Sequence, residues 1–210
     1  YASLKEYAEA AALYERAIDN IDTNDAMYWP LYYRMGIAYE RTKEWDKAEA
    51  AFKRALELSP NQPDVLNYLG YSWIDMNINL DEGLDMIQKA VEMRPRDGYI
   101  VDSLGWVYYR LGRFEDAVDE LEKAVDLRPR DAIINDHLGD AYWRVGRKLE
   151  ATYQWAQALD MEIEPADAAK IEAKLSASNT AGVKPELAVS QVDDATKGQA
   201  AASPETPNGG

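Results

Sequence analysis

This chain of 210 residues has no cysteine, one histidine and only two phenylalanines, although it has 14 tyrosines and 6 tryptophans. The lack of cysteine excludes disulfides, thiolate zinc sites and cysteine nucleophiles. Catalytic triads and histidine metal sites would need His137 beside a nucleophile or further ligands. There is also no apolar run of about 18 residues, the length that a membrane-spanning helix requires. These absences exclude several classes of enzyme and membrane protein.

Positive charge is also scarce. The chain has 23 Lys and Arg against 38 Asp and Glu, which gives a formal net charge of −15. Nucleic-acid binding depends on cations that displace phosphate counterions, so this surface is a poor candidate for it. A basic or neutral protein partner fits better. The apolar fraction of 47% is ample for a core, and tyrosine and tryptophan suit half-buried binding faces.

Three residue types recur with a period of 34 or 35 residues. The recurring positions are Gly36, Gly70, Gly105 and Gly139; Ala55, Ala90, Ala124 and Ala158; and Pro60, Pro95 and Pro129. A fixed period of this size indicates a stacked array of short units rather than one closed globule. Because arrays expose long surfaces, the pattern favours a recognition scaffold.

Each unit is predicted to be two helices joined by a short turn. In the unit 98–131, apolar residues recur at helical spacing in both halves. Gly112 is placed to end the first helix, Pro129 to stop the second, and Asp131 to cap the next. Counting from the glycines gives units at 29–62, 63–97, 98–131 and 132–165. The second unit is one residue longer, and the extra residue lies in the turn 76–83.

Both ends of the chain depart from the full unit. Residues 3–19 have the pattern of a second helix, so 1–28 is interpreted as the second helix of a truncated repeat plus a linker. We therefore expect the chain to be part of a longer array. Residues 166–175 are expected to form a capping helix over the last unit. The stretch 176–210 has few large apolar residues and is expected to be a disordered tail.

The repeated frame resembles the tetratricopeptide repeat over residues 3–165. The third unit carries that family's motif at Leu104, Gly105, Tyr108, Ala117, Leu121, Ala124 and Pro129. Two departures are visible: Glu82 and Gly83 occupy the alanine position of the second unit, and the proline of the last unit comes two residues late. The resemblance implies an all-α fold, a right-handed α-solenoid of helix-turn-helix repeats.

A narrower resemblance concerns location. The phrases LNYLGYSWID and GYIVDSLGWVYYRLG look like the C-terminal repeats of envelope-associated tetratricopeptide proteins of Proteobacteria. Members of that group are periplasmic or lipid-anchored adaptors in cell-wall proteolysis or envelope integrity. The resemblance therefore implies a bacterial envelope or periplasmic role, while a cytoplasmic location stays open.

In arrays that resemble this one, the first helix of each unit lines the inner, concave face. Counting positions within each unit gives the predicted partner-binding residues: Tyr33, Ile37, Arg41, Asn67, Tyr71, Ile74, Tyr99, Asp102, Trp106, Tyr109, Arg110, Ile133, Asp136, Asp140, Trp143 and Arg144. Trp, Tyr and Arg are the residue types that most often dominate binding energy at interfaces. Each of these residues also has a structural interpretation.

The aromatic residues of this set either form a row of binding anchors or pack against the next helix pair. The arginines either face a partner or complement the dipole at the end of their helix. Asp102, Asp136 and Asp140 would repel one another along a groove unless a partner or the arginines neutralise them. We therefore expect a protein or peptide partner with apolar anchors and some positive charge.

The leading hypothesis is a protein-binding adaptor that is not an enzyme and uses no cofactor or metal. His137 is interpreted as an ordinary first-helix residue at a repeat seam. A carboxylate clamp of the chaperone-binding type is not expected, because only Asn67 has a suitable side chain at the matching positions. Three alternatives stay open: a regulatory appendage of an enzyme whose catalytic domain lies upstream, a glycan-binding module, and self-association.

Overall fold

The computed structural model describes residues 4–19, 24–180 and 182, and this part of the chain contains helices and turns but no strand. A short 3-10 helix, η1 (Ala26–Tyr28), precedes the full pairs. The α-helices are α1 (Leu4–Ile18), α2 (Trp29–Arg41), α3 (Trp45–Leu58), α4 (Pro63–Asp75), α5 (Leu80–Met93), α6 (Gly98–Arg110), α7 (Phe114–Leu127), α8 (Ala132–Arg144), α9 (Lys148–Leu159) and α10 (Pro165–Thr180). The expected all-α solenoid is confirmed.

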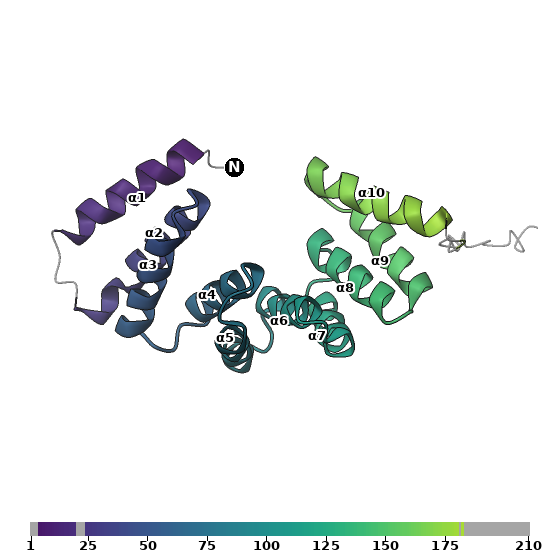
Figure 1. Cartoon of the computed structure of the whole chain (residues 1–210), viewed down its shortest axis with the longest axis horizontal. Coiled ribbons are helices and arrows are strands. Elements are labelled where there is room, and N and C mark those ends of the chain that lie inside the picture. Colours follow the sequence, from purple (N-terminus) through teal and green to yellow (C-terminus); the bar gives the residue numbers. More distant parts are fainter. Residues whose placement is uncertain (1–3, 20–23, 181, 183–210) are drawn as a thin grey trace, which may run out of the picture.

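The helices follow one another along an open arc (Figure 1). The most extensive packing joins α2 to α3, α4 to α5, α6 to α7 and α8 to α9, so the chain is a series of helical hairpins. At the two ends of the arc, α1 packs on α2 and α10 packs on α9. In the middle of the arc, α4 lies on the inner side and α5 on the outer side.

Close approach within each hairpin depends on the recurring glycine of the first helix. A Cβ added at three of these glycines would lie 2.5 Å from a side-chain atom of the second helix; the pairs are Gly36 with Phe52, Gly105 with Leu121, and Gly139 with Trp155. Carbon atoms in contact prefer separations of about 3.5–4.0 Å, so the added methyl would clash. The glycines therefore leave room for one large side chain from the partner helix.

The hairpin of α4 and α5 achieves the same close approach of its two helices in a different way. A Cβ at Gly70 would lie 2.6 Å from the backbone oxygen of Gly83, and a Cβ at Gly83 would lie 2.9 Å from the backbone oxygen of Gly70. Two glycines thus face each other, and the backbones touch. This contact explains why Gly83 replaces the alanine that the family motif has at this point.

Each hairpin turn uses one residue in the left-handed region. Lys43, Asn77, Gly112 and Gly146 hold the equivalent position with φ between 58° and 85°. The following amide in each turn donates to a carbonyl five residues earlier, which is the Schellman arrangement at a helix end. Asn79 adds a second left-handed residue, with φ 45°, to the turn between α4 and α5 alone. The extra residue of the 63–97 unit lies in this turn.

The C-terminal helix is longer than expected. α10 runs from Pro165 to Thr180, so residues 176–180, which composition assigned to the tail, are helical. Ile171 and Ser178 are both fully buried against the preceding hairpin, and this burial explains the extension. The rest of the expected tail, like residues 1–3 and 20–23, lies outside the described residues. None of the described helices is long and apolar enough to cross a membrane.

Gly70→Ala should destabilise the protein by about 2 kcal/mol, because overpacking costs about 1–3 kcal/mol and the opposing carbonyl cannot move aside. Gly105→Ala is the matched control. Its added methyl meets mainly the Leu121 side chain, which can change rotamer, so we expect a smaller loss. Urea unfolding followed by circular dichroism measures both. A Gly70→Ala variant as stable as the wild type would contradict the backbone-contact explanation.

Candidate functional site

A groove with a cavity volume of about 460 Å³ opens between the first helices of four successive hairpins. The helix α4 supplies more lining residues than any other helix, α2 and the start of α3 form one side, and α6 and α8 form the other. We call it the inner groove. Its lining residues are Glu40, Arg41, Trp45, Asn67, Tyr68, Tyr71, Ser72, Asp75, Met76, Tyr99, Asp102, Ser103, Ile133 and His137.

Six of the sixteen predicted partner-binding residues line this groove: Arg41, Asn67, Tyr71, Tyr99, Asp102 and Ile133. Three large apolar side chains of the lining are exposed, namely Met76 (40%), Tyr99 (52%) and Ile133 (40%). Exposed apolar groups around a concave surface are typical of a ligand site. The groove therefore combines apolar contact area with polar groups from several repeats.

Three predicted residues of α2 and α4 pack inside the protein. Tyr33 and Ile37 are half-buried and contact the N-terminal core, where the Tyr33 ring meets the Tyr68 ring edge-on at 6.1 Å. Ile74 is only 3% exposed and belongs to the core between the second and third hairpins. The prediction that Ile74 faces a partner is wrong, because its side chain points toward α5.

The charged groups of the inner groove are paired within the protein. Arg110 donates to the Asp75 carboxylate at 2.6 Å and to the Asp75 backbone oxygen at 3.2 Å. Asp102 pairs with Nδ1 of His137 at 2.9 Å. On the other side, Glu40 accepts a hydrogen bond from the Tyr68 hydroxyl at 3.1 Å. The groove thus has little uncompensated charge, although the whole chain is strongly acidic.

Two neutral polar atoms of the groove residues lack a partner among the described residues. The indole Nε1 of Trp45 is a buried donor, and Oδ1 of Asn67 is a buried acceptor. Such orphan groups are rare in native proteins, and each costs about 1–3 kcal/mol. Tyr71 lies on the same helix as Asn67; burial and the nearby Asp75 raise the pKa of its hydroxyl to about 12. The hydroxyl therefore stays a neutral donor and acceptor at physiological pH.

The predicted anchors Trp106 and Tyr109 stack on rings of the same protein. The Trp106 and Tyr109 ring centroids lie 4.7 Å apart with an interplanar angle of 7°. The imidazole of His137, from the next hairpin, stacks on Trp106 at 4.1 Å and 16°. Tyr109 also meets Phe114 edge-on at 5.4 Å. These contacts make Trp106 part of a seam between hairpins, and its role as an anchor stays a prediction.

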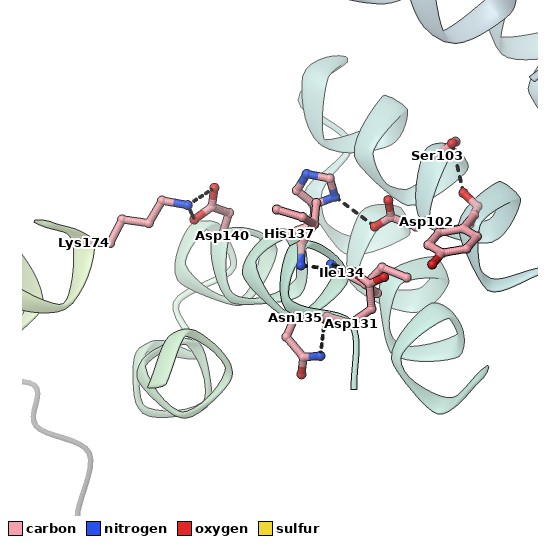
Figure 2. Close-up of polar contacts among 10 residues, drawn as sticks. Asp102, Ser103, Asp131, Ile134, Asn135, His137, Asp140 and Lys174 are labelled. Carbon is pink, nitrogen blue, oxygen red and sulfur yellow. Dashed lines mark hydrogen bonds and ion pairs between the residues drawn. The ribbon is translucent and has the colours of Figure 1, made fainter. Parts of the chain in front are cut away.

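The two carboxylates of α8 receive a cation from α10. Nζ of Lys174 lies 2.7 Å from an oxygen of Asp136. It also lies 2.7 Å from an oxygen of Asp140 (Figure 2). The Trp155 indole also donates to Asp140 at 3.1 Å. Burial raises the pKa of Asp140, and Lys174 partly offsets this effect. Since the chain supplies this cation itself, the positive charge expected of the partner stays a prediction.

The three equivalent arginines have different surroundings, and Trp143 packs internally. Arg110 reaches back to Asp75 at the end of α4, whereas Arg144 lies 3.9 Å from the centre of the Phe114 ring. Arg41 forms an ion pair with the adjacent Glu40, at 3.4 Å. The Trp143 ring lies against the Trp155 ring at 5.4 Å. Equivalent sequence positions therefore do not imply equivalent roles.

Sequence reasoning missed several lining residues, above all Trp45 and His137. Trp45 begins a second helix, and the position count considered first helices only. His137 was interpreted as a seam residue; it does lie at a seam, but it also lines the groove. A signal was present in the spacing, because His137 and Asp102 are 35 residues apart, as are Arg110 and Asp75. One repeat period separates the partners of each pair.

Among known proteins, two family models match the chain. One, described as TPR repeat, matches residues 105–146, and the other, described as tetratricopeptide repeat, matches residues 29–62. A TPR repeat-containing protein of Pseudomonas aeruginosa is 31% identical over 87 residues, which is 41% of this chain and 15% of that protein. The photosystem I assembly protein Ycf3 of Prochlorococcus marinus is 28% identical over 86 residues, 40% of this chain and 49% of that protein. The chain thus spans less than half of either relative.

Solved structures of MamA have the same fold. MamA from Desulfovibrio magneticus has a TM-score of 0.64 and 22% identity, covering 74% of this chain and 85% of that chain. A second MamA structure has a TM-score of 0.61 and 25% identity, covering 73% of this chain and 88% of that chain. These likenesses establish the solenoid fold of the described helices.

Lys174→Met should lower the free energy of unfolding by about 1–3 kcal/mol, because it leaves two largely buried carboxylates without their cation. Lys170→Met, one turn earlier on α10, removes only the exposed pair with Asp167 and should change stability by less than about 0.5 kcal/mol. Urea titration measures both variants. Equal losses would show that Lys174 is no more than a surface cation.

The Asp102–His137 pair should make stability depend on pH. Burial lowers the pKa of His137, but the carboxylates of Asp102, Asp136 and Asp140 outweigh burial and raise it overall, despite Lys174 beyond them. Because the pKa of His137 is higher in the folded state, its charged form stabilises the folded protein. This stabilisation is fully present below the pKa of the unfolded state, about 6.5, and it is lost as pH rises through the pKa of the folded state.

His137→Gln removes this titration. The difference in unfolding free energy between wild type and variant should be largest near pH 5.5 and should shrink by pH 9. Urea unfolding across this range measures it. A difference that stays constant with pH would contradict the charged pair.

Proposed function

Because this chain is a tetratricopeptide-repeat protein, we propose that it is an adaptor that holds an extended segment of a partner protein in the inner groove. Proteins with such repeats bind protein partners, and the fold is typically non-catalytic. The absence of enzyme activity in this chain stays a prediction. A place in the cell envelope and a role in proteolysis also stay predictions, and attachment to an upstream enzyme stays an alternative.

One observation carries the proposal: the groove residues include an orphan donor on Trp45 and an orphan acceptor on Asn67. A peptide backbone offers a carbonyl acceptor and an amide donor at almost every residue. A segment lying along α4 could satisfy both groups after small side-chain movements.

The apolar rim supports the same proposal. Met76, Tyr99 and Ile133 are exposed large side chains on three successive repeats, so they offer contacts to apolar side chains along an extended segment. The proposed partner segment therefore has apolar anchors, and some positive charge on it stays a prediction because the groove charges are paired internally. Two relatives bear names that concern protein assemblies, the Ycf3 assembly protein and the BBSome complex member BBS4 of Bos taurus.

Selection from a phage-displayed library of random dodecapeptides on the full chain tests the proposal. Peptides recovered on the wild type should lose about tenfold or more in affinity on Tyr71→Ala, since truncating an interface anchor costs more than about 1–2 kcal/mol. Trp45→Phe keeps an aromatic ring but removes the Nε1 donor, and we expect it to weaken binding about three- to tenfold. Fluorescence polarisation measures these affinities.

Met93→Ala is the matched control, because Met93 is exposed on the outer helix α5. It should leave peptide affinity unchanged. Circular dichroism should show that every variant folds. Failure to select any peptide, or equal binding by the wild type and the groove variants, would overturn the proposal; titration of cell-wall glycan fragments against tryptophan fluorescence then tests the glycan alternative.

A further inference from the structure

The only histidine of the chain lies in the wall of the inner groove. Nδ1 of His137 is 2.9 Å from Oδ1 of Asp102, which lies on the preceding repeat. The imidazole also stacks on Trp106 with a centroid distance of 4.1 Å. A ring held by a carboxylate at one edge and an indole at one face has a fixed orientation. Its remaining nitrogen therefore has a fixed direction as well.

That nitrogen, Nε2, is free to meet a ligand. It makes no hydrogen bond to any described residue. It is also not one of the buried, unpartnered side-chain atoms of the described residues, so it is accessible from outside. In Figure 2 the two ring nitrogens of His137 are visible, and Nε2 points away from Asp102. Since His137 lines the inner groove, a bound segment can reach this atom.

We propose that Nε2–H of His137 donates a hydrogen bond to a main-chain carbonyl oxygen of the bound partner segment, and that affinity for the segment falls as pH rises. This inference rests on the proposed function, since it assigns a contact to the occupant of the inner groove.

The protonation chemistry follows from the partner of Nδ1. When the imidazole is charged, both nitrogens carry hydrogen, so Nδ1–H donates to Asp102 and Nε2–H points outward. On deprotonation the hydrogen at Nδ1 is retained, because Asp102 accepts it, and the proton leaves from Nε2 to solvent. Nε2 then becomes an acceptor and repels a carbonyl oxygen. One proton therefore converts a favourable contact into an unfavourable one.

The surroundings favour the charged form of the ring. Asp102 faces it from α6, Asp136 and Asp140 lie on its own helix α8, and Lys174 from α10 is the opposing cation. Together the carboxylates raise the pKa of His137 above its ordinary value, against the effect of burial. The acidic surroundings also decide between ligands. A carboxylate of a ligand would be repelled by the three carboxylates near His137, whereas a neutral carbonyl group would not be repelled.

The test uses the full chain and the dodecapeptides selected from the random library at pH 6. Their dissociation constants are measured from pH 5.5 to 9 by fluorescence polarisation. For the wild type we expect affinity to fall about tenfold or more over this range, as a charge-assisted hydrogen bond is lost. His137→Gln keeps an N–H donor that does not titrate in this range, so its affinity should be nearly independent of pH.

Two further variants locate the effect. Asp102→Asn removes the neighbouring charge, so the fall in affinity should move to lower pH. Asp119→Asn removes an exposed carboxylate from the outer helix α7 and should leave the wild-type profile unchanged. The Hε1 proton signal of the single histidine gives the midpoint of its titration by NMR, and this midpoint should match the binding profile of the wild type.

The outcomes separate the two proposals. Peptides that bind the wild type equally at all pH values overturn the role of His137 but not the adaptor function. The same holds if His137→Gln shows the wild-type dependence on pH. A histidine signal that titrates below about 6.5 also overturns the inference. If neither the wild type nor His137→Gln selects any peptide at pH 6, the proposed function fails, and this inference fails with it.

Discussion

The close approach of the two helices in each hairpin is the constraint on which the rest of the structure depends. Where Gly70 faces Gly83, even one added methyl group would meet the opposing backbone and force the helices apart, and where Gly105 faces Leu121 it would displace the Leu121 side chain. The distance within a hairpin sets how far its first helix projects toward the inner side of the arc. Because the inner groove is formed by first helices from four hairpins, small residues in the core determine the shape of a distant surface.

Polar contacts between neighbouring hairpins then fix the groove side chains. Arg110 binds the end of α4, and His137 binds Asp102 of α6, each across one repeat period. In a solenoid each unit contacts only its neighbours, so such links have to be made anew at every seam. The seams differ in chemistry: one uses a guanidinium and another an imidazole. The groove therefore has different polar groups at different seams, although all the repeats have the same sequence motif.

The sequence predicts the fold well and the groove only in part, for physical reasons. Apolar spacing, glycine and proline are local signals, so helices, turns and the longer 63–97 unit could all be expected. The position of a residue within its repeat predicts which face of the helix carries its side chain, but it does not predict which side chains of other helices lie beside it. Thus Asp136 and Asp140 could be assigned to the inner face, but Lys174, on a helix outside the repeat pattern, could not be matched to them. Composition likewise missed the last turn of α10, because the burial of Ser178 depends on the α9 surface.

The distribution of charge explains how an acidic chain can present a groove suited to neutral groups. The net charge of −15 arises over the whole sequence, whereas the carboxylates at the inner groove have partners within the chain. Exposed acidic residues elsewhere are expected to disfavour association with polyanions. Buried orphan donors and acceptors on groove residues discriminate more sharply than charges, because a ligand that does not supply the matching hydrogen bond leaves these groups unpaired. Net charge and groove chemistry are therefore expected to act on different classes of molecule: the acidic surface disfavours polyanions, and the proposed groove contacts would select among protein segments.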